Sequence, residues 1–286
     1  MHQKLSNLDR QIEALPGWLS RCDISILKTI MRYQDLKDIN GDILEIGCYL
    51  GKSAILFGAL KKNDNELIVC DCFDDVVEEA NYDENISSYP QLTRNAFEAN
   101  YRNALGTLPT IIQADSKHLK NLLEKRVFRI VHIDGSHLYE YVRHDLDFAR
   151  TFVEDGLIVL DDFRAQHTLG VTQALWESVI KSEVFPVIVS PSKIYLATKK
   201  NHGYLTEVFL ELLSGEINYE WVLVSGSRCI RITGISDGEI YSSGKKLSQF
   251  IPPVMLPLAR RIKRFFKAKN FLFRRTASIP VKRTKA

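Results

Sequence analysis

Acidic residues follow five predicted strands, and their positions could support chemistry at one place in the fold. Strands are predicted at residues 42–46, 66–72, 110–113, 128–133 and 156–160. Ligands of open parallel sheets bind beyond the carboxyl ends of the strands. Carboxylates gathered there could hold a cation, accept hydrogen bonds from hydroxyl groups or take a proton from a substrate. The acids at those ends are Glu45, Asp71, Asp115, Asp134, Asp161 and Asp162.

The stretch Gly41–Ser53, GDILEIGCYLGKS, predicts a strand that turns through glycines into a helix. Gly47 and Gly51 permit a turn that a Cβ would strain, and they let backbone N–H groups approach a ligand at the positive end of the helix. The spacing is not the G-x-G-x-x-G of dinucleotide enzymes. Glu45 would repel a pyrophosphate but could hold an ammonium group. We therefore expect a ligand with an amino-acid end and a nucleoside end, held by Glu45, Gly47, Gly51 and Ser53.

Two further acids suit the nucleoside part of such a ligand. Asp71, at the end of the second strand, could accept hydrogen bonds from both ribose hydroxyls, or it could cap the segment that follows. We favour the ribose contact. Asp115 could bind an exocyclic adenine amine or cap the helix predicted from Ser116, and the sequence prefers neither interpretation.

Asp134, Asp161 and Asp162 form a second group at adjacent strand ends. Three converging carboxylates repel one another unless a positive charge lies between them. Oxygen ligands of this kind suit a hard divalent ion such as Mg²⁺, which we prefer to the alternative of a capping Asp162 and a protonated Asp134. His137 follows Asp134 in a loop, where it is either a base for a substrate hydroxyl or a solvated histidine.

The pattern of elements predicts an α/β fold with a doubly wound, mostly parallel, seven-stranded sheet and one antiparallel edge strand. Strands alternate with helices up to a hairpin at 184–198, and the alternation then stops. The expected organisation is a helical cover at 1–40, a ligand-binding domain at 41–200, a small α+β appendage at 201–245 and a basic amphipathic tail at 246–286.

Composition indicates one large domain with appendages. The 286 residues are 45% hydrophobic and 26% charged, which provides an ample core. The N-terminus lacks a secretory pattern, and no apolar run approaches the roughly 18 residues of a membrane helix. Five cysteines, an odd number, argue against a disulfide framework. We expect a soluble, cytoplasmic protein, and self-association is an open alternative.

The net charge of +3 conceals a basic tail. From Ile240 to Ala286 there are 13 Lys and Arg and no Asp or Glu, so the other residues carry 3 − 13 = −10. Four phenylalanines, at 265, 266, 271 and 273, alternate with these charges. We rank binding to an anionic membrane surface at the inner face first. A solubilising or docking tail comes second, and nucleic-acid binding is disfavoured.

The glycine loop with Asp71 and Asp115 resembles the cofactor site of class I S-adenosylmethionine-dependent methyltransferases. The segment HIDGSHLYE at 132–140, with GLIVLDD at 156–162, is similar to the metal-dependent macrocin-type sugar O-methyltransferases and their cephalosporin-hydroxylase-like relatives. The resemblance covers roughly residues 40–200 and implies a Rossmann-like methyltransferase fold.

The resemblance also implies a mechanism. Asp134, Asp161 and Asp162 would hold Mg²⁺ or another divalent cation, which would bind neighbouring oxygens of a saccharide or glycoconjugate. His137 or Asp134 would take the hydroxyl proton while the methyl group leaves S-adenosylmethionine. The alternatives are a hydroxylase-like activity on the same fold and a non-catalytic scaffold that acts through the basic tail.

Overall fold

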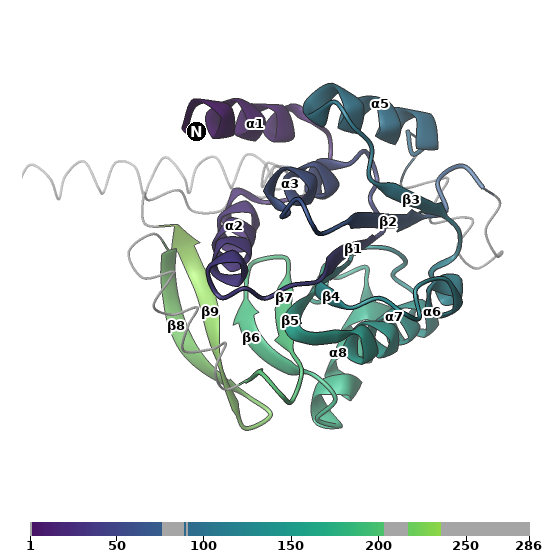
Figure 1. Ribbon diagram of the computed structural model, residues 1–286. Helices are drawn as coiled ribbons and strands as arrows, with labels where there is room; N and C mark the ends of the chain where they lie inside the picture. The colour runs from purple at the N-terminus through teal and green to yellow at the C-terminus, as the bar shows by residue number, and fades with distance from the viewer. Residues whose placement is uncertain (1, 76–88, 90, 203–216, 236–286) are drawn as a thin grey trace, which may run out of the picture. The chain divides into compact units, whose positions relative to one another are not determined.

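The computed structural model describes residues 2–75, 89, 91–202 and 217–235 (Figure 1). Residues 203–216 and 236–245 of the predicted appendage and the basic tail at 246–286 lie outside the described residues. The elements below belong to the unit that spans Met1–Ile240.

A nine-stranded sheet runs through the described chain in the order β3-β2-β1-β4-β5-β7-β6-β9-β8. The first five strands of this order are parallel. Both faces of β4 are buried, as expected for a sheet covered by helices on each side. The predicted α/β, doubly wound, mostly parallel fold is thus confirmed. The strands are β1 (Asp42–Ile46), β2 (Leu67–Asp71), β3 (Thr110–Gln113), β4 (Phe128–Ile133), β5 (Val153–Leu160), β6 (Phe185–Val189), β7 (Ile194–Ala197), β8 (Ile217–Val224) and β9 (Ser227–Ile235).

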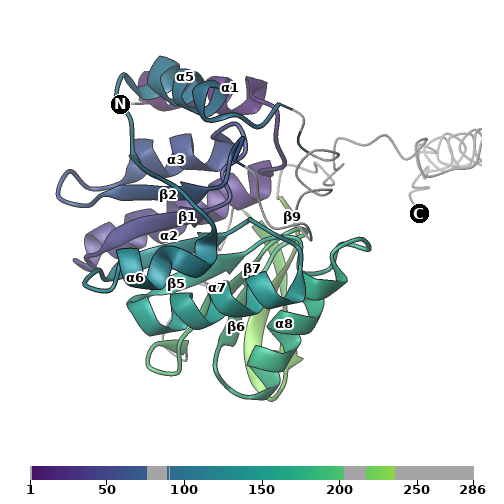
Figure 2. The same ribbon diagram turned by 90° about the vertical axis from the view of Figure 1, so that its right-hand side faces the viewer.

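Two groups of helices cover the sheet (Figures 1 and 2). Helix α3 (Lys52–Leu60) contacts α1 (His2–Ala14), α2 (Arg21–Leu36) and α5 (Arg94–Leu105). On the other side, α7 (Tyr139–Phe152) packs along α8 (Leu169–Ile180). Next to α7 lie a short 3₁₀ turn, η1 (Ser116–His118), and α6 (Leu119–Leu122). Along β1, Leu44 and Ile46 join the core beneath α7 and α8, so the alternation of a strand turns Glu45 to the opposite face.

The strand count and the place of the antiparallel strand differ from the prediction. β7 is antiparallel to both β5 and β6 and lies between them, so it is an interior strand. The segment predicted as a separate β appendage is a hairpin that extends the sheet, because β9 pairs in parallel with β6 at Ile188↔Ile230. Ile230 and Ile232 are buried by this pairing. The hairpin thereby adds two strands to the predicted seven.

The N-terminal helices are tied to the elements that carry the glycine loop. Lys52, at the start of α3, donates to the carbonyl oxygens of Leu15 and Gly17 at 3.2 and 3.3 Å. In α2, Gln34 donates to the backbone carbonyl of Arg129 in β4. These contacts fix the first helices against α3 and the central strands. Among the described residues, no helix is long and apolar enough to cross a membrane.

Candidate active site

The predicted acids lie along one edge of the sheet. Backbone hydrogen bonds continue past the strand ends, from Gly47 N to Cys70 O (2.8 Å) and from Asp134 N to Ile46 O (2.8 Å). A third joins Asp161 N to Ile133 O at 3.0 Å. β1 stands between β2 and β4, where the strand order reverses, which is the ligand-binding position of open α/β sheets.

The glycine loop touches the loop that carries Asp134. Gly47 has φ +80°, and a Cβ at this position would lie 2.2 Å from the carbonyl oxygen of Asp134. Gly51 has φ +93° and is the N-cap of α3, while Ser53 is buried in the first turn of that helix. Both predicted glycines therefore adopt conformations that side chains disfavour. The absence of a Cβ at position 47 brings the two loops into contact.

Asp71 holds the glycine loop to the end of β2. One carboxylate oxygen accepts from the backbone N–H of Cys48 and the other from that of Phe73, each at 2.8 Å. Its carboxylate therefore has the capping role that the sequence left as an alternative. Each oxygen keeps a second lone pair, so a ribose contact is compatible with this arrangement and remains a prediction.

Asp115 caps the turn that follows β3. Its side chain accepts from the backbone N–H of Lys117 at 2.8 Å, at the start of η1. The structure thus contains the capping interaction that the sequence weighed against an adenine contact. The adenine contact itself stays a prediction.

Glu45 lies inside the protein, paired with His132 on the neighbouring strand. Oε1 of Glu45 is 2.9 Å from Nδ1 of His132, and both side chains are fully buried. Burial raises the pKa of Glu45 to about 8 and lowers that of His132 well below its usual value. At neutral pH the pair is therefore largely uncharged. The predicted contact between Glu45 and an ammonium group stays a prediction.

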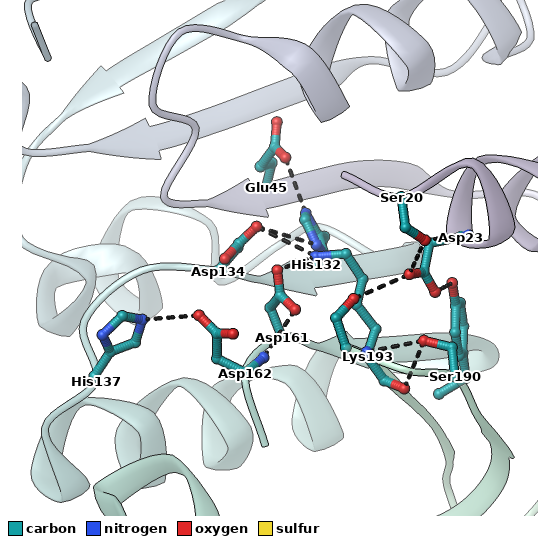
Figure 3. A network of polar contacts seen from close by, with 12 residues as sticks. Ser20, Asp23, Glu45, His132, Asp134, His137, Asp161, Asp162, Ser190 and Lys193 are labelled. Atoms are coloured by element: carbon teal, nitrogen blue, oxygen red, sulfur yellow. Dashed lines mark hydrogen bonds and ion pairs between the residues drawn. The ribbon is translucent and has the colours of Figure 1, made fainter. Parts of the chain in front are cut away.

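Asp134 and Asp161 share a buried ammonium group, that of Lys193 (Figure 3). Nζ of Lys193 lies 3.3 Å from Oδ2 of Asp134 and closer still to Oδ2 of Asp161. Burial raises the pKa of both carboxyl groups, and Lys193 opposes that effect. Burial alone would lower the pKa of Lys193, but the carboxylates raise it above its ordinary value. We infer that Lys193 is protonated.

Asp162 pairs with His137. Oδ2 of Asp162 is 3.4 Å from Nε2 of His137, whose ring lies edge-on to that of His167. Asp162 has φ +53°, and its backbone N–H donates to Oδ1 of Asp161 at 2.8 Å. Burial raises the pKa of Asp162, but His137, Lys193 and His167 together lower it more, so that the net shift is downward. This conformation directs Asp162 toward His137 rather than toward Lys193 (Figure 3).

Asp134 and Asp161, together with Asp162 and His137, line a common hollow with about 190 Å³ of space, open solvent included. The side chain of Asp134 is 30% exposed and that of Asp162 is 35% exposed, so a molecule from solvent can reach both. The lining residues are Ile133, Asp134, Gly135, Ser136, His137, Val142, Leu160, Asp161, Asp162 and Val171. Asp134, His137, Asp161 and Asp162 are therefore brought together as predicted, whereas Glu45, Asp71 and Asp115 lie outside this lining.

Lys193 is the site residue that sequence reasoning missed. It follows the hairpin turn at Pro191-Ser192, where a lysine is normally solvated. The β5–β7 register pairs Leu160 with Ile194, which places the next residues, Asp161 and Lys193, side by side. The sequence pattern predicted one antiparallel edge strand and did not predict that β7 pairs with β5, so it did not indicate this contact.

The arrangement does not fit the predicted Mg²⁺ site. The ammonium group of Lys193 contacts two of the three proposed ligands, and Asp162 is directed to His137. A divalent ion between Asp134 and Asp161 would be forced against a buried like charge. Within the described residues, no group of three or more His, Cys, Asp or Glu side chains is placed to hold a metal ion.

One protein-family model matches the residues around the candidate site. Residues 44–163 match a family model described as "Methyltransferase domain". This region of the chain is therefore similar to a methyltransferase domain. The match begins in β1 and ends just after Asp162, so it contains the glycine loop, both acidic loops and His137. Lys193 lies beyond the matched residues.

Comparisons with curated proteins and with solved structures do not add a family assignment. No curated protein matches the chain. Among solved structures, the O-methyltransferase NovP aligns at 15% identity and TM-score 0.48, over 61% of this chain and 78% of its own. The calicheamicin methyltransferase CalS11 aligns at 16% identity and TM-score 0.45, over 68% and 91%. TomG from Streptomyces achromogenes, in complex with SAM, aligns at 14% and 0.44, over 68% and 89%. Likenesses at this level do not define the activity of this chain.

Proposed function

We propose that the methyltransferase domain transfers a methyl group from S-adenosylmethionine to a hydroxyl oxygen of a saccharide or glycoconjugate. The observation that carries this proposal is the contact between the glycine loop and the acidic hollow. Position 47 cannot hold a Cβ, because the loop at the end of β1 lies against the backbone of Asp134. A donor held by the first loop would lie beside groups able to accept a proton.

The glycine loop suits the amino-acid and nucleoside ends of S-adenosylmethionine. Gly47 and Gly51 form the turn that leads into α3, and the dipole at the amino end of that helix favours a carboxylate. Asp71 fixes that loop and keeps lone pairs for ribose hydroxyls. When bound, S-adenosylmethionine supplies an electrophilic methyl group on a sulfonium. Holding donor and acceptor in line accounts for much of the acceleration in such reactions.

The hollow provides two bases for the acceptor. Asp134 is partly exposed and next to the glycine loop, and His137 is oriented by Asp162. A base of this kind is needed for a hydroxyl, which is a weak nucleophile until its proton is removed. In the proposed step the acceptor proton passes to Asp134 or His137 as the oxygen takes the methyl group. The neutral sulfur of S-adenosylhomocysteine leaves.

The saccharide acceptor is proposed from the resemblance of residues 132–140 and 156–162 and from the polar lining. Ser136, His137 and Asp162 present hydrogen-bonding groups around the hollow. Neighbouring hydroxyls of a sugar would match these groups. We derive no step through a divalent ion, since Lys193 contacts Asp134 and Asp161.

Incubation of the full chain with methyl-labelled S-adenosylmethionine and a panel of sugars and glycoconjugates tests the function. The proposal expects S-adenosylhomocysteine and label in a base-stable methyl ether. A Gly47→Val variant should lose cofactor binding by calorimetry. Formation of S-adenosylhomocysteine with a hydroxylated product would favour the hydroxylase-like alternative. Absence of cofactor binding would favour a scaffold.

The tail at 246–286 and the place of the reaction are also proposals. The 12 basic residues of this tail and the interspersed phenylalanines support contact with an anionic membrane surface. A lipid-linked glycan at the cytoplasmic face would be an acceptor suited to that location.

A further inference from the structure

Lys193 is enclosed more completely than a surface lysine of a hairpin would be. Its side chain is 1% exposed, and its ammonium group lies between Asp134 and Asp161 (Figure 3). Lysine is rarely buried unless it is paired, because an isolated buried charge is costly. The pairing with two carboxylates therefore accounts for its position.

The backbone around Lys193 is fixed by a short network. The N–H of Lys193 donates to Oγ of Ser190 at 2.9 Å, and the N–H of Ser190 donates to the carbonyl oxygen of Lys193 at 2.9 Å. On either side, Ser192 and Tyr195 donate to the buried carboxylate of Asp23 in α2, at 3.0 and 2.8 Å. Lys193 thus lies directly before β7, in a turn that hydrogen bonds hold at both ends. Its side chain extends from this fixed backbone to the acidic hollow.

The position of the ammonium group matches a requirement of the site. Asp134 and Asp161 repel each other, and a cation between them reduces that repulsion. The sequence predicted a divalent ion at this place, whereas the structure has the ammonium group of Lys193 there. Lysine has three donors, and two carboxylates occupy part of that capacity.

We propose that Lys193 is the resident cation of this site, in place of a divalent metal ion, and that it positions Asp134 as the base for the acceptor hydroxyl. This inference rests on the proposed function for its catalytic part. The pairing engages Oδ2 of Asp134, which leaves Oδ1 for the acceptor. Lys193 acts through Asp134, so it is a positioning residue.

The proton and electron balance needs no further reactant. The acceptor O–H gives its proton to the carboxylate of Asp134, and the oxygen forms a bond to the methyl carbon. The bond between that carbon and the sulfonium breaks, and sulfur keeps the electron pair. Asp134 then releases its proton to solvent, while Lys193 remains protonated throughout.

Turnover by the full chain after chelation provides the first test. Protein treated with EDTA and returned to metal-free buffer should retain its rate, and added Mg²⁺ or Mn²⁺ should change it less than about twofold. Lys193→Met should lower kcat by about 100-fold, a typical contribution of proton transfer, with S-adenosylmethionine affinity unchanged. The matched control is Lys200→Met, since Lys200 is 64% exposed and pairs with Asp155 at the surface. This control should behave as wild type.

Rescue separates positioning from packing. Lys193→Ala should recover part of its lost turnover when a small alkylammonium ion or Mg²⁺ is added, and Lys200→Ala should respond to neither. A lost rate that no cation restores, in a folded variant that still binds S-adenosylmethionine, would overturn the positioning role.

Titration of wild-type protein with Mn²⁺, followed by calorimetry and electron paramagnetic resonance, works even if the lysine variants do not fold. If the proposal is correct, wild-type protein has no stoichiometric Mn²⁺ site that depends on Asp161, so Asp161→Asn removes no Mn²⁺ binding. Stoichiometric binding that depends on Asp161, or loss of turnover on chelation that metal restores, would overturn the proposal. A wild-type protein that neither binds nor consumes S-adenosylmethionine would contradict the proposed function, while the Mn²⁺ result would still decide the cation.

Discussion

Glu45 and His132 form a fully buried pair on adjacent strands, with 2.9 Å between Oε1 and Nδ1. Register pairs the two residues across β1 and β4, and Phe57 of α3 lies edge-on to the imidazole. Nε2 of His132 is 3.7 Å from Asp134, too far for a hydrogen bond. The pair thereby connects the strand beneath the glycine loop to the strand that ends in the acidic hollow.

The pH dependence of stability should reveal the titration of Glu45. Burial raises its folded-state pKa from 4.5 to about 8, so between these values the folded chain holds a proton that the unfolded chain has lost. Stability from this group is therefore present below pH 4.5 and is lost as pH rises through 8. Relative to Glu45→Gln, wild type should lose more than about 1.4 kcal/mol of unfolding free energy between pH 5 and 8.5, the equivalent of one pKa unit.

Urea unfolding of both proteins at about pH 5 and about pH 8.5 measures this difference. The other buried carboxyl groups titrate in both proteins, so their contributions cancel in the comparison. A difference in unfolding free energy between wild type and variant that stays constant with pH would contradict the raised pKa of Glu45.

Gly47 should tolerate no side chain. Its φ of +80° strains an L-residue, and a Cβ would lie 2.2 Å from the Asp134 carbonyl oxygen. Gly47→Ala should lower the unfolding free energy by more than about 3 kcal/mol, because the clash adds to backbone strain. Gly106 is a matched control, since it has φ +77° but nothing within 4 Å of the place where a Cβ would lie.

Gly106→Ala should therefore show the backbone cost alone, about 1 kcal/mol. If urea unfolding shows that the two variants are destabilised equally, the loop at Gly47 is not in tight contact with Asp134. Calorimetry with S-adenosylmethionine should show weakened binding for Gly47→Ala only.

Most of the parallel sheet could be predicted from the sequence, because strands such as 110–113 and 128–133 are bounded by turns and alternate with helices. The acids at the strand ends followed from that order. Strand pairing beyond β5 could not be predicted, since it depends on contacts distant in sequence. The interior place of β7, and with it the burial of Lys193, is set by register rather than by any local pattern. The burial of Glu45 beside His132 could not be predicted from spacing either, and its contact with an ammonium group stays a prediction.

Asp71 should be needed for cofactor binding through the loop that it fixes. Asp71→Asn removes one of two charge-assisted hydrogen bonds to the N–H groups of Cys48 and Phe73. We expect S-adenosylmethionine affinity to fall about tenfold to 100-fold, which corresponds to about 1.4 to 2.8 kcal/mol. Calorimetry measures the affinity, and Asp64→Asn in the exposed turn before β2 is the control. Unchanged affinity would mean that neither the loop nor a ribose depends on this carboxylate.

The basic tail should bind anionic vesicles. It has 12 Lys and Arg and no acidic residue, which favours a surface rich in phosphatidylserine or phosphatidylglycerol. Sedimentation with such vesicles should retain the full chain at low salt and release it at high salt, and a chain truncated at residue 245 should not sediment. Equal binding to neutral vesicles, or binding by the truncated chain, would place the membrane contact elsewhere or exclude it.

His137 should act on the acceptor rather than on the cofactor. It lies 3.4 Å from Asp162 in the lining of the hollow, outside the glycine loop. If its imidazole takes the acceptor proton, His137→Gln should lower kcat by about 10² to 10⁴, with S-adenosylmethionine affinity unchanged. Asp162→Asn should give a smaller loss in the same direction, because it removes only the partner that orients the ring. His118→Gln, at an exposed position of η1, should keep full turnover. A His137→Gln enzyme with wild-type kcat would indicate that Asp134 is the base. Asp134 is the second candidate proton acceptor of the hollow, and Lys193 positions it.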